Sequence, residues 1–346
     1  MEKFRTTKKY IMSTGKNICF FILIVILNIS AAVAQEGQEW ISYEPGDGPG
    51  NGKHIVLISG DEEYRSEEAL PMLAKILAKH HGFKTTVLFA IDPETGKVDP
   101  DNQENIPGLD QLETADLMIM FLRFRELPDE QMKYIDEYMA AGKPVVALRT
   151  STHAFNYSRN KNSPFAKYSF DSAAEGWEGG FGRKVLGETW IAHHGNHGKE
   201  STRGLVNGLL ENHAILRGVK DIWGATDVYT VRDLDKAEVL VYGQSTHGMT
   251  AESPLSFQKS VMPVAWIKYY TNENGNTARI FNTTMGAAID LESEDLRRLL
   301  VNACYWAVGM DHQIPEKNFV DIIGEYDPTM FGYGDFKKGL TPSDFK

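Results

Sequence analysis

The sequence predicts an α/β fold in which a parallel sheet is covered by helices on both faces. Short, continuously apolar runs, typical of buried parallel strands, alternate with amphipathic segments that have the period of a helix. Alternation at this spacing places parallel strands in one sheet and the connecting helices on its faces. Residues 151–250 are less regular and rich in glycine and aromatic residues, which predicts a large loop-rich insertion.

The expected elements follow in order along the chain. A Gly/Pro-rich segment at 35–53 precedes the first strand, HIVLISG, at 54–60. A helix is expected at 66–82, where Ser66 can cap the start and Gly82 stops the end. The other expected elements are a helical turn at 109–114, helices at 128–142 and 293–309, and strands at 84–90, 116–124, 144–151, 226–231, 238–244, 262–270 and 278–286. We expect one domain at 54–313, with a C-terminal extension at 314–346 packed on it.

The first 34 residues have the organisation of a secretory signal peptide. A basic stretch precedes an apolar run, and Ala32-Val33-Ala34 offers small residues for cleavage before Gln35. A short membrane anchor is the alternative. The clean small-x-small ending favours cleavage after Ala34, and therefore a secreted or periplasmic protein.

Charge and cysteine content exclude several classes of protein. Removal of the signal segment takes away five basic residues and one acidic residue, so the net charge of −11 becomes −15. A chain this acidic is a poor partner for nucleic acid or anionic lipid. Cys304 would be the only remaining cysteine, which excludes an intramolecular disulfide. The sequence contains no second long apolar run, so stable membrane insertion is not expected after cleavage. The oligomeric state is not predicted.

Polar residues follow four of the predicted strands. Ligands of open α/β sheets bind beyond the carboxyl ends of the strands, so these residues should share one cleft. We expect Asp61 to be catalytic. The expected substrate-binding residues of this group are Glu62, Arg65, Arg123, Arg149 and Asp290. Glu63 and Arg125 belong to the same stretches, whereas Glu67 and Glu68 are expected to be solvated acids that complement a helix N-terminus.

The RTSTHAF stretch, which follows the strand at 144–151, carries His153. This histidine is a candidate base or substrate hydrogen bonder; the alternative is a buried histidine satisfied by a backbone carbonyl. The turn contains neither cysteine nor a G-x-S-x-G motif. Ser151 remains a possible nucleophile, but no histidine–acid pair can be assigned to it.

The segment WIAHHGNHGKESTRG contains three histidines, His193, His194 and His197. Gly195 and Gly198 exclude a helical zinc motif. If His193 and His194 continue an extended segment, they face opposite sides, so only one of them faces a given site. We expect a catalytic role for His193 or His194 beside His153, and substrate contacts from Trp190 and Arg203. The expected metal ligands are His153, His194 and His197, with zinc as the first candidate and His247 as a further ligand; a metal-free site is the alternative.

Several blocks of the sequence, in order, resemble the trehalose-utilisation (ThuA-like) family, in particular its secreted bacterial branch. They are HIVLISGDEEYRSEEALPMLAKILAKHHGF, FLRFRELPDEQ, GKPVVALRTSTHAF, FGRKVLGETWIAHHGNH and TTMGAAIDLESEDLRRLLVNACYWAVG. The resemblance implies a class I glutamine amidotransferase-like, flavodoxin-like fold. True amidotransferases carry a cysteine after the strand that here reads VVALR, where this chain has Thr150, Ser151 and Thr152. Glutaminase activity is therefore not expected.

The resemblance also implies a role in disaccharide catabolism, beside dehydrogenases that make 3-keto-glycosides. Our first hypothesis is an enzyme that removes the acidified C2 proton of such a sugar. Isomerisation or elimination follows through an enediolate, with a histidine base and either a divalent metal, Arg149 or Arg65 as electrophile. Hydrolysis by paired carboxylates is a less favoured variant. The second hypothesis is a non-catalytic sugar-binding protein. No nucleotide cofactor is expected.

Overall fold

The computed structural model of the protein describes residue 1, residues 39–234 and residues 236–346. The predicted signal peptide, apart from its first residue, lies outside the described residues, as does the start of the Gly/Pro-rich segment. Residues 39–346 cluster as a single unit. Within the described ranges, no helix has both the length and the apolar character needed to cross a membrane.

The named strands belong to one ten-stranded sheet, a mixed α/β architecture with few long helices. The strands are β1 Trp40–Tyr43, β2 His54–Gly60, β3 Lys84–Phe89, β4 Leu117–Leu122, β5 Val145–Leu148, β6 Thr202–Val206, β7 Ile222–Gly224, β8 Ala237–Ser245, β9 Met262–Thr271 and β10 Thr277–Thr283. The α-helices are α2 Ser66–Lys79, α3 Asp129–Ala140 and α4 Glu294–Ala307. Short helical turns are η1 Leu109–Glu113, η2 Arg149–His153, η3 Ala166–Tyr168, η4 Gly182–Leu186, η5 Gly208–Leu210, η6 Ala214–Leu216, η7 Ala288–Glu292, η8 Asp311–Gln313 and η9 Pro342–Phe345.

The centre of the sheet is parallel, in the order β3-β2-β4-β5-β10. Strands β2, β4 and β5 are buried along their whole length, as continuously apolar sequences require. Counted along the chain, these five strands lie in the order 2-1-3-4-5, which reverses between β2 and β4. In sheets of this kind a crevice opens beyond the carboxyl ends of the strands at such a reversal.

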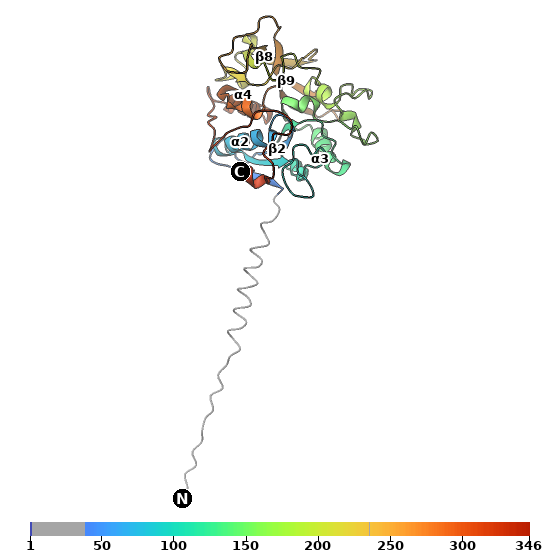
Figure 1. Ribbon diagram of the computed structural model, residues 1–346. Coiled ribbons are helices and arrows are strands. Elements are labelled where there is room, and N and C mark those ends of the chain that lie inside the picture. The colour runs from blue at the N-terminus through green and yellow to red at the C-terminus, as the bar shows by residue number, and fades with distance from the viewer. Residues whose placement is uncertain (2–38, 235) are drawn as a thin grey trace. The chain divides into compact units, whose positions relative to one another are not determined.

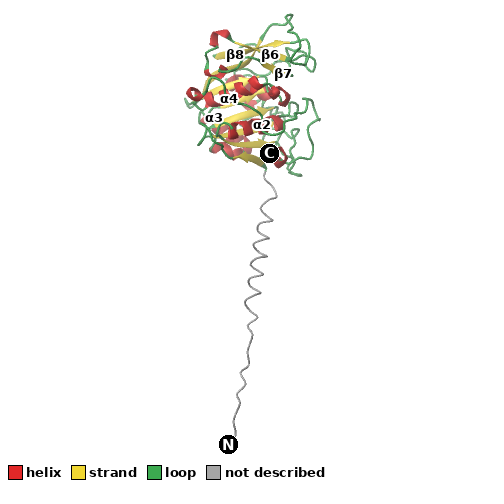
Figure 2. Ribbon diagram, turned by 90° about the vertical axis from the view of Figure 1, so that its left-hand side faces the viewer, coloured by secondary structure: helices red, strands yellow, loops and turns green. Residues whose placement is uncertain are grey.

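Helices cover both faces of the parallel strands. Leu70 and Leu73 of α2 and Leu299 of α4 share one apolar cluster with residues of one sheet face. Met132 and Ile135 of α3 belong to the cluster on the opposite face. Figure 2 shows α2 and α4 lying across the sheet. Both faces of the parallel strands are therefore covered by apolar side chains, and a polar site is expected at the strand ends.

The sheet is not wholly parallel, because four strands extend it: β8 and β9 were expected as strands, whereas β6 and β7 form within the stretch expected to be loop-rich. Strands β9, β8, β6 and β7 continue the sheet antiparallel beyond β10, and Figure 1 shows β8 and β9 at the end away from β2. At the other edge, β1 pairs antiparallel with β3 inside a segment expected to be irregular. The strand expected at 226–231 does not form; the strand there is β7, a few residues earlier.

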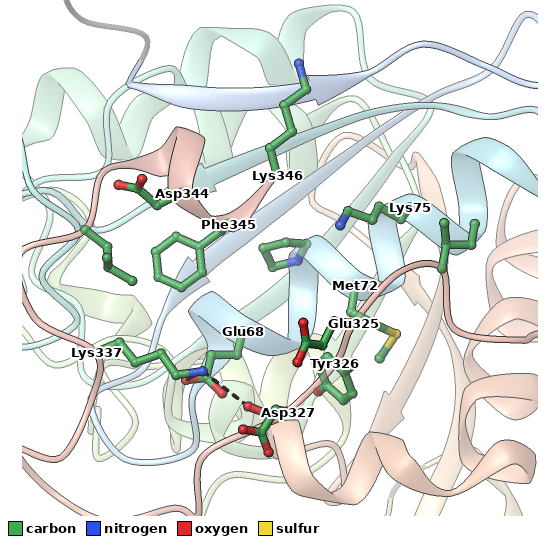
Figure 3. A pocket seen from close by; sticks show the side chains of 13 residues that line it. Glu68, Met72, Lys75, Glu325, Tyr326, Asp327, Lys337, Asp344, Phe345 and Lys346 are labelled. Carbon is green, nitrogen blue, oxygen red and sulfur yellow. Dashed lines mark hydrogen bonds and ion pairs between the residues drawn. The ribbon is translucent and has the colours of Figure 1, made fainter.

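The C-terminal segment, residues 314–346, runs back over α2. It encloses a cavity of about 210 Å³, drawn in Figure 3. One ion pair lies at this cavity: the Nζ atom of Lys337 lies 3.4 Å from a Glu68 carboxylate oxygen, and it also donates to the backbone carbonyl of Asp327 at 3.2 Å. We therefore treat this cavity as part of the packing of the C-terminal segment.

Candidate active site

Backbone hydrogen bonds join the loops that follow β2, β4 and β5. The amide of Arg123 donates to the carbonyl of Gly60, at 2.9 Å, which ties the β4 loop to the end of β2. The amides of Phe124 and Arg125 donate to the carbonyls of His153 and Ala154, at 2.9 and 2.6 Å. The three loops therefore form one rigid edge, and side chains far apart in sequence are held at fixed positions.

Each of these loops contains a non-glycine residue in the left-handed backbone region. The φ angles are 61° at Arg65, 51° at Phe124 and 44° at Arg149. Such residues cost on the order of 1–3 kcal/mol each and persist where the surroundings over-determine them. Strained residues of this type gather at functional sites, and three at one sheet edge point to this edge.

A buried arginine–aspartate pair lies beneath the site. One terminal nitrogen of Arg149 lies 3.2 Å from Oδ1 of Asp227, and the other donates to the Asp227 carbonyl at 2.8 Å. Both side chains are fully buried. The Arg149 guanidinium also lies over the rings of Tyr64 and Tyr229, at 4.5 and 3.9 Å. These contacts hold a charge that would otherwise be costly to bury.

Asp227 binds two histidines of the HHGNH segment. Its Oδ2 atom accepts from Nδ1 of His193 at 2.8 Å, and its Oδ1 atom from Nδ1 of His197 at 3.2 Å. The backbone allows this approach because residue 195 is glycine: a Cβ atom there would lie 2.8 Å from the Asp227 Cβ atom. The ligand atoms of the three side chains lie within 4.8 Å of one another, which is compact enough to hold a metal ion.

These contacts set the charge states of the cluster. Burial raises the pKa of Asp227, but hydrogen bonds from His193 and His197 and the charge of Arg149 outweigh it, so the pKa lies well below its usual range. The hydrogen bond to Asp227 raises the pKa of His197, with burial opposing and Glu63 assisting. Asp227 is therefore an anion at neutral pH and holds the Nδ1 protons of its partners.

A cavity of about 200 Å³ opens beside this cluster. It is lined by Glu63, Arg123, Phe124, His153, Trp190, His193, Tyr229 and Tyr333. Aromatic walls surround a few convergent polar groups, which is the usual composition of a small-molecule site. Side-chain exposure of 34% leaves the His193 ring accessible from the cavity.

His153 forms the inner wall of the cavity. Its ring packs 4.9 Å from that of Phe124 and 5.6 Å from that of Trp190, between centroids. Among the described residues its single side-chain hydrogen-bond partner is the hydroxyl of Thr152, 3.2 Å from Nδ1. Burial, with the nearby charges of Arg123 and Arg149, holds the pKa of His153 well below its usual range. The imidazole is therefore neutral at pH 7.

Asp61 and Glu62 support the site from beneath. Asp61 is fully buried; its Oδ1 atom accepts from the amides of Glu63 and Tyr64, and its Oδ2 atom from the hydroxyl of Thr150. Both carboxylate oxygens of Asp61, which was expected to be catalytic, are therefore occupied by hydrogen bonds within the protein. Glu62, expected to bind substrate, pairs instead with Arg123 and Arg125. Burial raises the pKa of Glu62 and the arginines oppose the rise.

The structure places three predicted site residues away from the cavity wall. Nε2 of His194 is 2.8 Å from the Ser260 carbonyl oxygen, because the extended backbone turns this ring away from His193. Arg203 pairs with Asp221 at the antiparallel end of the sheet. Asp290 is buried and accepts from the backbone amide of Thr226, at 3.0 Å, and from its hydroxyl, at 2.6 Å.

The expected metal set of His153, His194 and His197 does not gather at one point; among the described residues, the group whose ligand atoms lie together is His193, His197 and Asp227. Two further expectations also change. Arg65 is buried and donates to Thr329 and to the Glu63 carbonyl, so it braces the loop instead of binding a ligand. Glu67 and Glu68, expected to be solvated, are buried, and Glu68 accepts from the amide and hydroxyl of Thr329 in the C-terminal segment.

Three residues of the site, Asp227, Tyr229 and Tyr333, were not predicted from the sequence. Asp227 and Tyr229 stand in a run that has the composition of a strand, and they reach the site only because residues 192–195 pair with residues 228–230. Tyr333 arrives from the C-terminal segment. An acid within an apolar run, TDVYTV, was the one available signal.

Cys304, the one cysteine among the described residues, is not placed to act as a nucleophile. It is buried in the apolar face of α4, and burial raises its pKa. The turn after β5, where an amidotransferase would carry its cysteine, holds Thr150, Ser151 and Thr152 as η2. The hydroxyl of Ser151 donates to the Met120 carbonyl at 2.9 Å, so it is bound to β4.

The chain is similar to several solved structures. One is a protein described as ThuA-like from Parabacteroides merdae ATCC 43184, with 14% identity, a TM-score of 0.45 and coverage of 81% of this chain and 97% of that one. The N-terminal domain of mmIFT52 follows, with 10% identity, a TM-score of 0.39 and coverage of 73% and 96%. PurLQS from Thermotoga maritima has 11% identity, a TM-score of 0.36 and coverage of 73% and 99%. Neither a family model nor a curated protein matches the sequence. A function is therefore inferred from the side chains of the cavity.

Proposed function

We propose that the protein is a carbohydrate-processing enzyme that removes a proton next to a carbonyl group, with a 3-keto-glycoside as substrate. The observation that carries the proposal is the hydrogen bond between His193 and Asp227 at the wall of a cavity that also contains His153. An anionic carboxylate on Nδ1 fixes the imidazole tautomer and leaves Nε2 as a base, as in other histidine–aspartate pairs. A flavodoxin-like core is part of the proposal, supported by the 2-1-3-4-5 order of the parallel strands.

The two histidines have different roles in this proposal. His193 takes the proton from C2 of the sugar, because Asp227 stabilises the imidazolium that forms. His153 is neutral, and with Thr152 on Nδ1 its Nε2–H can donate to the oxygen on C3 as the enediolate develops. Transfer of the proton to C3, with loss of the proton of the C2 hydroxyl, gives the isomeric 2-keto sugar. Departure of the glycosidic oxygen from C1, with uptake of the proton held by His193, gives elimination.

The polar and aromatic residues of the cavity suit a sugar. Arg123 can donate to hydroxyl groups, and Glu63 can accept from them. Trp190 and Phe124 supply apolar faces beside His153. The carboxylates of the site are paired with arginines, so no unpaired cation of the described residues is offered to an anionic ligand, and this composition favours a neutral, hydroxyl-rich substrate.

A divalent metal ion also fits the cluster. Two imidazole nitrogens and one carboxylate oxygen are the donor set of many catalytic zinc sites and leave a position open. His193, His197 and Asp227 would hold the ion, which would act as a Lewis acid toward a sugar oxygen when bound. With an ion bound, His193 would serve as a ligand, and His153 would be the residue left to act as the base of the site.

Solvent deuterium exchange at C2 tests the proposal directly. We expect the protein to incorporate deuterium at C2 of a 3-keto-disaccharide and to leave the unoxidised disaccharide unchanged. His193→Ala should abolish exchange, whereas His194→Ala, the matched histidine that faces Ser260, should retain it. Binding of the disaccharide without exchange or turnover would support a non-catalytic sugar-binding protein instead.

Metal analysis separates the two forms of the site. If a metal is bound, His193→Ala and His197→Ala should both lose it, and a chelator should stop exchange in the wild-type protein. If the site is metal-free, exchange should survive the chelator and depend more strongly on His193 than on His197.

A further inference from the structure

The C-terminal segment completes the wall of the cavity. The amide of Gly332 donates to the carbonyl of Glu63 at 2.8 Å, which joins this segment to the loop after β2. The ring of Phe331 packs 5.4 Å from that of Tyr64 and 5.3 Å from that of His197, between centroids. Residues 331–333 are therefore held against the histidine cluster although they lie outside the sheet.

Tyr333 is the residue of this segment that lines the cavity. Its hydroxyl donates to Oε2 of Glu63 at 2.8 Å and accepts from a terminal nitrogen of Arg123 at 2.7 Å. The guanidinium carbon of Arg123 lies 5.2 Å from the Tyr333 ring centroid and 4.5 Å from that of Phe124. The hydroxyl is thus fixed between two charged groups.

The rest of Tyr333 remains open to solvent. The residue is 60% exposed, whereas the other tyrosine of the cavity, Tyr229, is 3% exposed. A tyrosine that serves only the core would bury its ring. Here the polar end is anchored and an aromatic surface is left free at the outer edge of the cavity, an arrangement that suits contact with an amphipathic ligand.

We propose that Tyr333 forms an outer subsite that binds the second sugar ring of a disaccharide, and so selects glycosides over free monosaccharides. The inference rests on the proposed function. The sugar that reacts is placed between His153 and His193, and Tyr333, which is 60% exposed, lines the same cavity of about 200 Å³. A second ring attached to the first would meet the open face of Tyr333, which is rigid because of its bonds to Glu63 and Arg123.

Three substitutions of Tyr333 distinguish the contribution of its ring from that of its hydroxyl group. Tyr333→Phe keeps the aromatic face, Tyr333→Leu keeps an apolar side chain without that face, and Tyr333→Ala removes both. We expect Tyr333→Ala and Tyr333→Leu to raise KM for a 3-keto-disaccharide about tenfold, equivalent to about 1.4 kcal/mol. The ratio of KM for the 3-keto-disaccharide to KM for the 3-keto-monosaccharide should rise in both variants, and Tyr333→Phe should keep the wild-type ratio. Phe319→Ala, at an exposed aromatic of the same segment that contacts His80, is the matched control.

A binding measurement that needs no turnover keeps this inference distinct from the proposed reaction. Calorimetric titration of the intact protein with trehalose as the probe should show weaker binding for Tyr333→Ala and Tyr333→Leu than for the wild type and Phe319→Ala. This result supports the subsite even if no keto-sugar reacts. Equal affinities, equal KM values for the disaccharide, or no binding and no turnover of a disaccharide by the wild type would overturn it. Thermal unfolding identifies any variant that is not folded. If Tyr333→Ala does not fold, the result for Tyr333→Leu tests the subsite.

Discussion

Asp227 lies 2.8 Å from Nδ1 of His193, and this contact joins two irregular segments that are 34 residues apart in the chain. The carboxylate is buried, anionic and shared with His197 and Arg149. It therefore fixes the tautomer and the orientation of both histidine rings.

Replacement of Asp227 by asparagine should remove this control. We expect C2 exchange to fall by about 10³-fold or more, the order of magnitude seen when a histidine loses its orienting carboxylate. The pKa of His197 should also fall, because the Asp227 hydrogen bond is the largest influence that raises it. Histidine NMR titration measures the second effect independently. Asp221→Asn, at the exposed partner of Arg203, should change neither quantity.

Loss of Arg149 should affect stability more than chemistry. Removal of one partner of a buried ion pair typically costs about 3–5 kcal/mol, because the remaining charge is left buried. We expect Arg149→Met to lower the free energy of unfolding by an amount of this order in denaturant titrations. The matched surface variant, Arg203→Met, should cost less than about 1 kcal/mol, as exposed pairs do. Similar losses in both variants would contradict this assignment.

Glu67 predicts a pH dependence of stability. The residue is buried, neither carboxylate oxygen has a hydrogen-bond partner among the described residues, and burial raises its pKa to about 8. A raised pKa means that the folded state binds this proton more tightly than the unfolded state. The stabilisation is therefore complete below the ordinary pKa of glutamate and is lost as the pH rises toward 8.

The slope of this loss is at most about 1.4 kcal/mol per pH unit. In Glu67→Gln, which carries no ionisable proton at this position, unfolding free energies measured between pH 5 and pH 9 should depend less on pH than those of the wild type. Glu130→Gln, in the first turn of α3 and exposed, serves as the control. Parallel pH profiles for Glu67→Gln and the wild type would show that Glu67 does not contribute.

Replacement of Gly195 by alanine should lower activity without preventing folding. A methyl group at this position would lie 2.8 Å from Cβ of Asp227, so Gly195→Ala should push the histidine segment away from its carboxylate. We expect a loss of C2 exchange of about tenfold or more, because small misplacements of catalytic groups are costly. Gly208→Ala meets nothing within 4 Å and should behave as wild type. An active Gly195→Ala variant would show that the segment tolerates displacement.

Most elements of the parallel core could be predicted from the sequence, because their signals are local. HIVLISG and PVVAL are continuous apolar runs, and they form β2 and β5. The helix at α2 follows from its amphipathic period and its glycine stop. The same locality explains the prediction that Arg123 and His153 lie beside the cavity, since residues that follow parallel strands meet at one edge.

The parts that could not be predicted depend on contacts between irregular segments. TDVYTV has the composition of a strand, yet only Tyr229 forms an isolated bridge, to His193, and Asp227 turns inward to the histidines. Nothing in the local pattern distinguishes His193 from His194, because the choice depends on which side of the backbone meets Asp227. Tyr333 lies about 270 residues from its partner Glu63, in a segment without periodicity.

The left-handed backbone at Arg65, Phe124 and Arg149 implies a trade-off between robustness and activity. Each of these positions would be relaxed by glycine, which adopts positive φ angles without steric cost. Selection for heat resistance alone would therefore favour glycine at Phe124, where the backbone strain disappears but the ring beside Arg123 and His153 is lost. A directed-evolution experiment scored only on survival after heating should therefore accumulate glycine at Phe124 but keep Arg149, whose loss leaves Asp227 without its buried partner, and its products should gain stability while they lose activity.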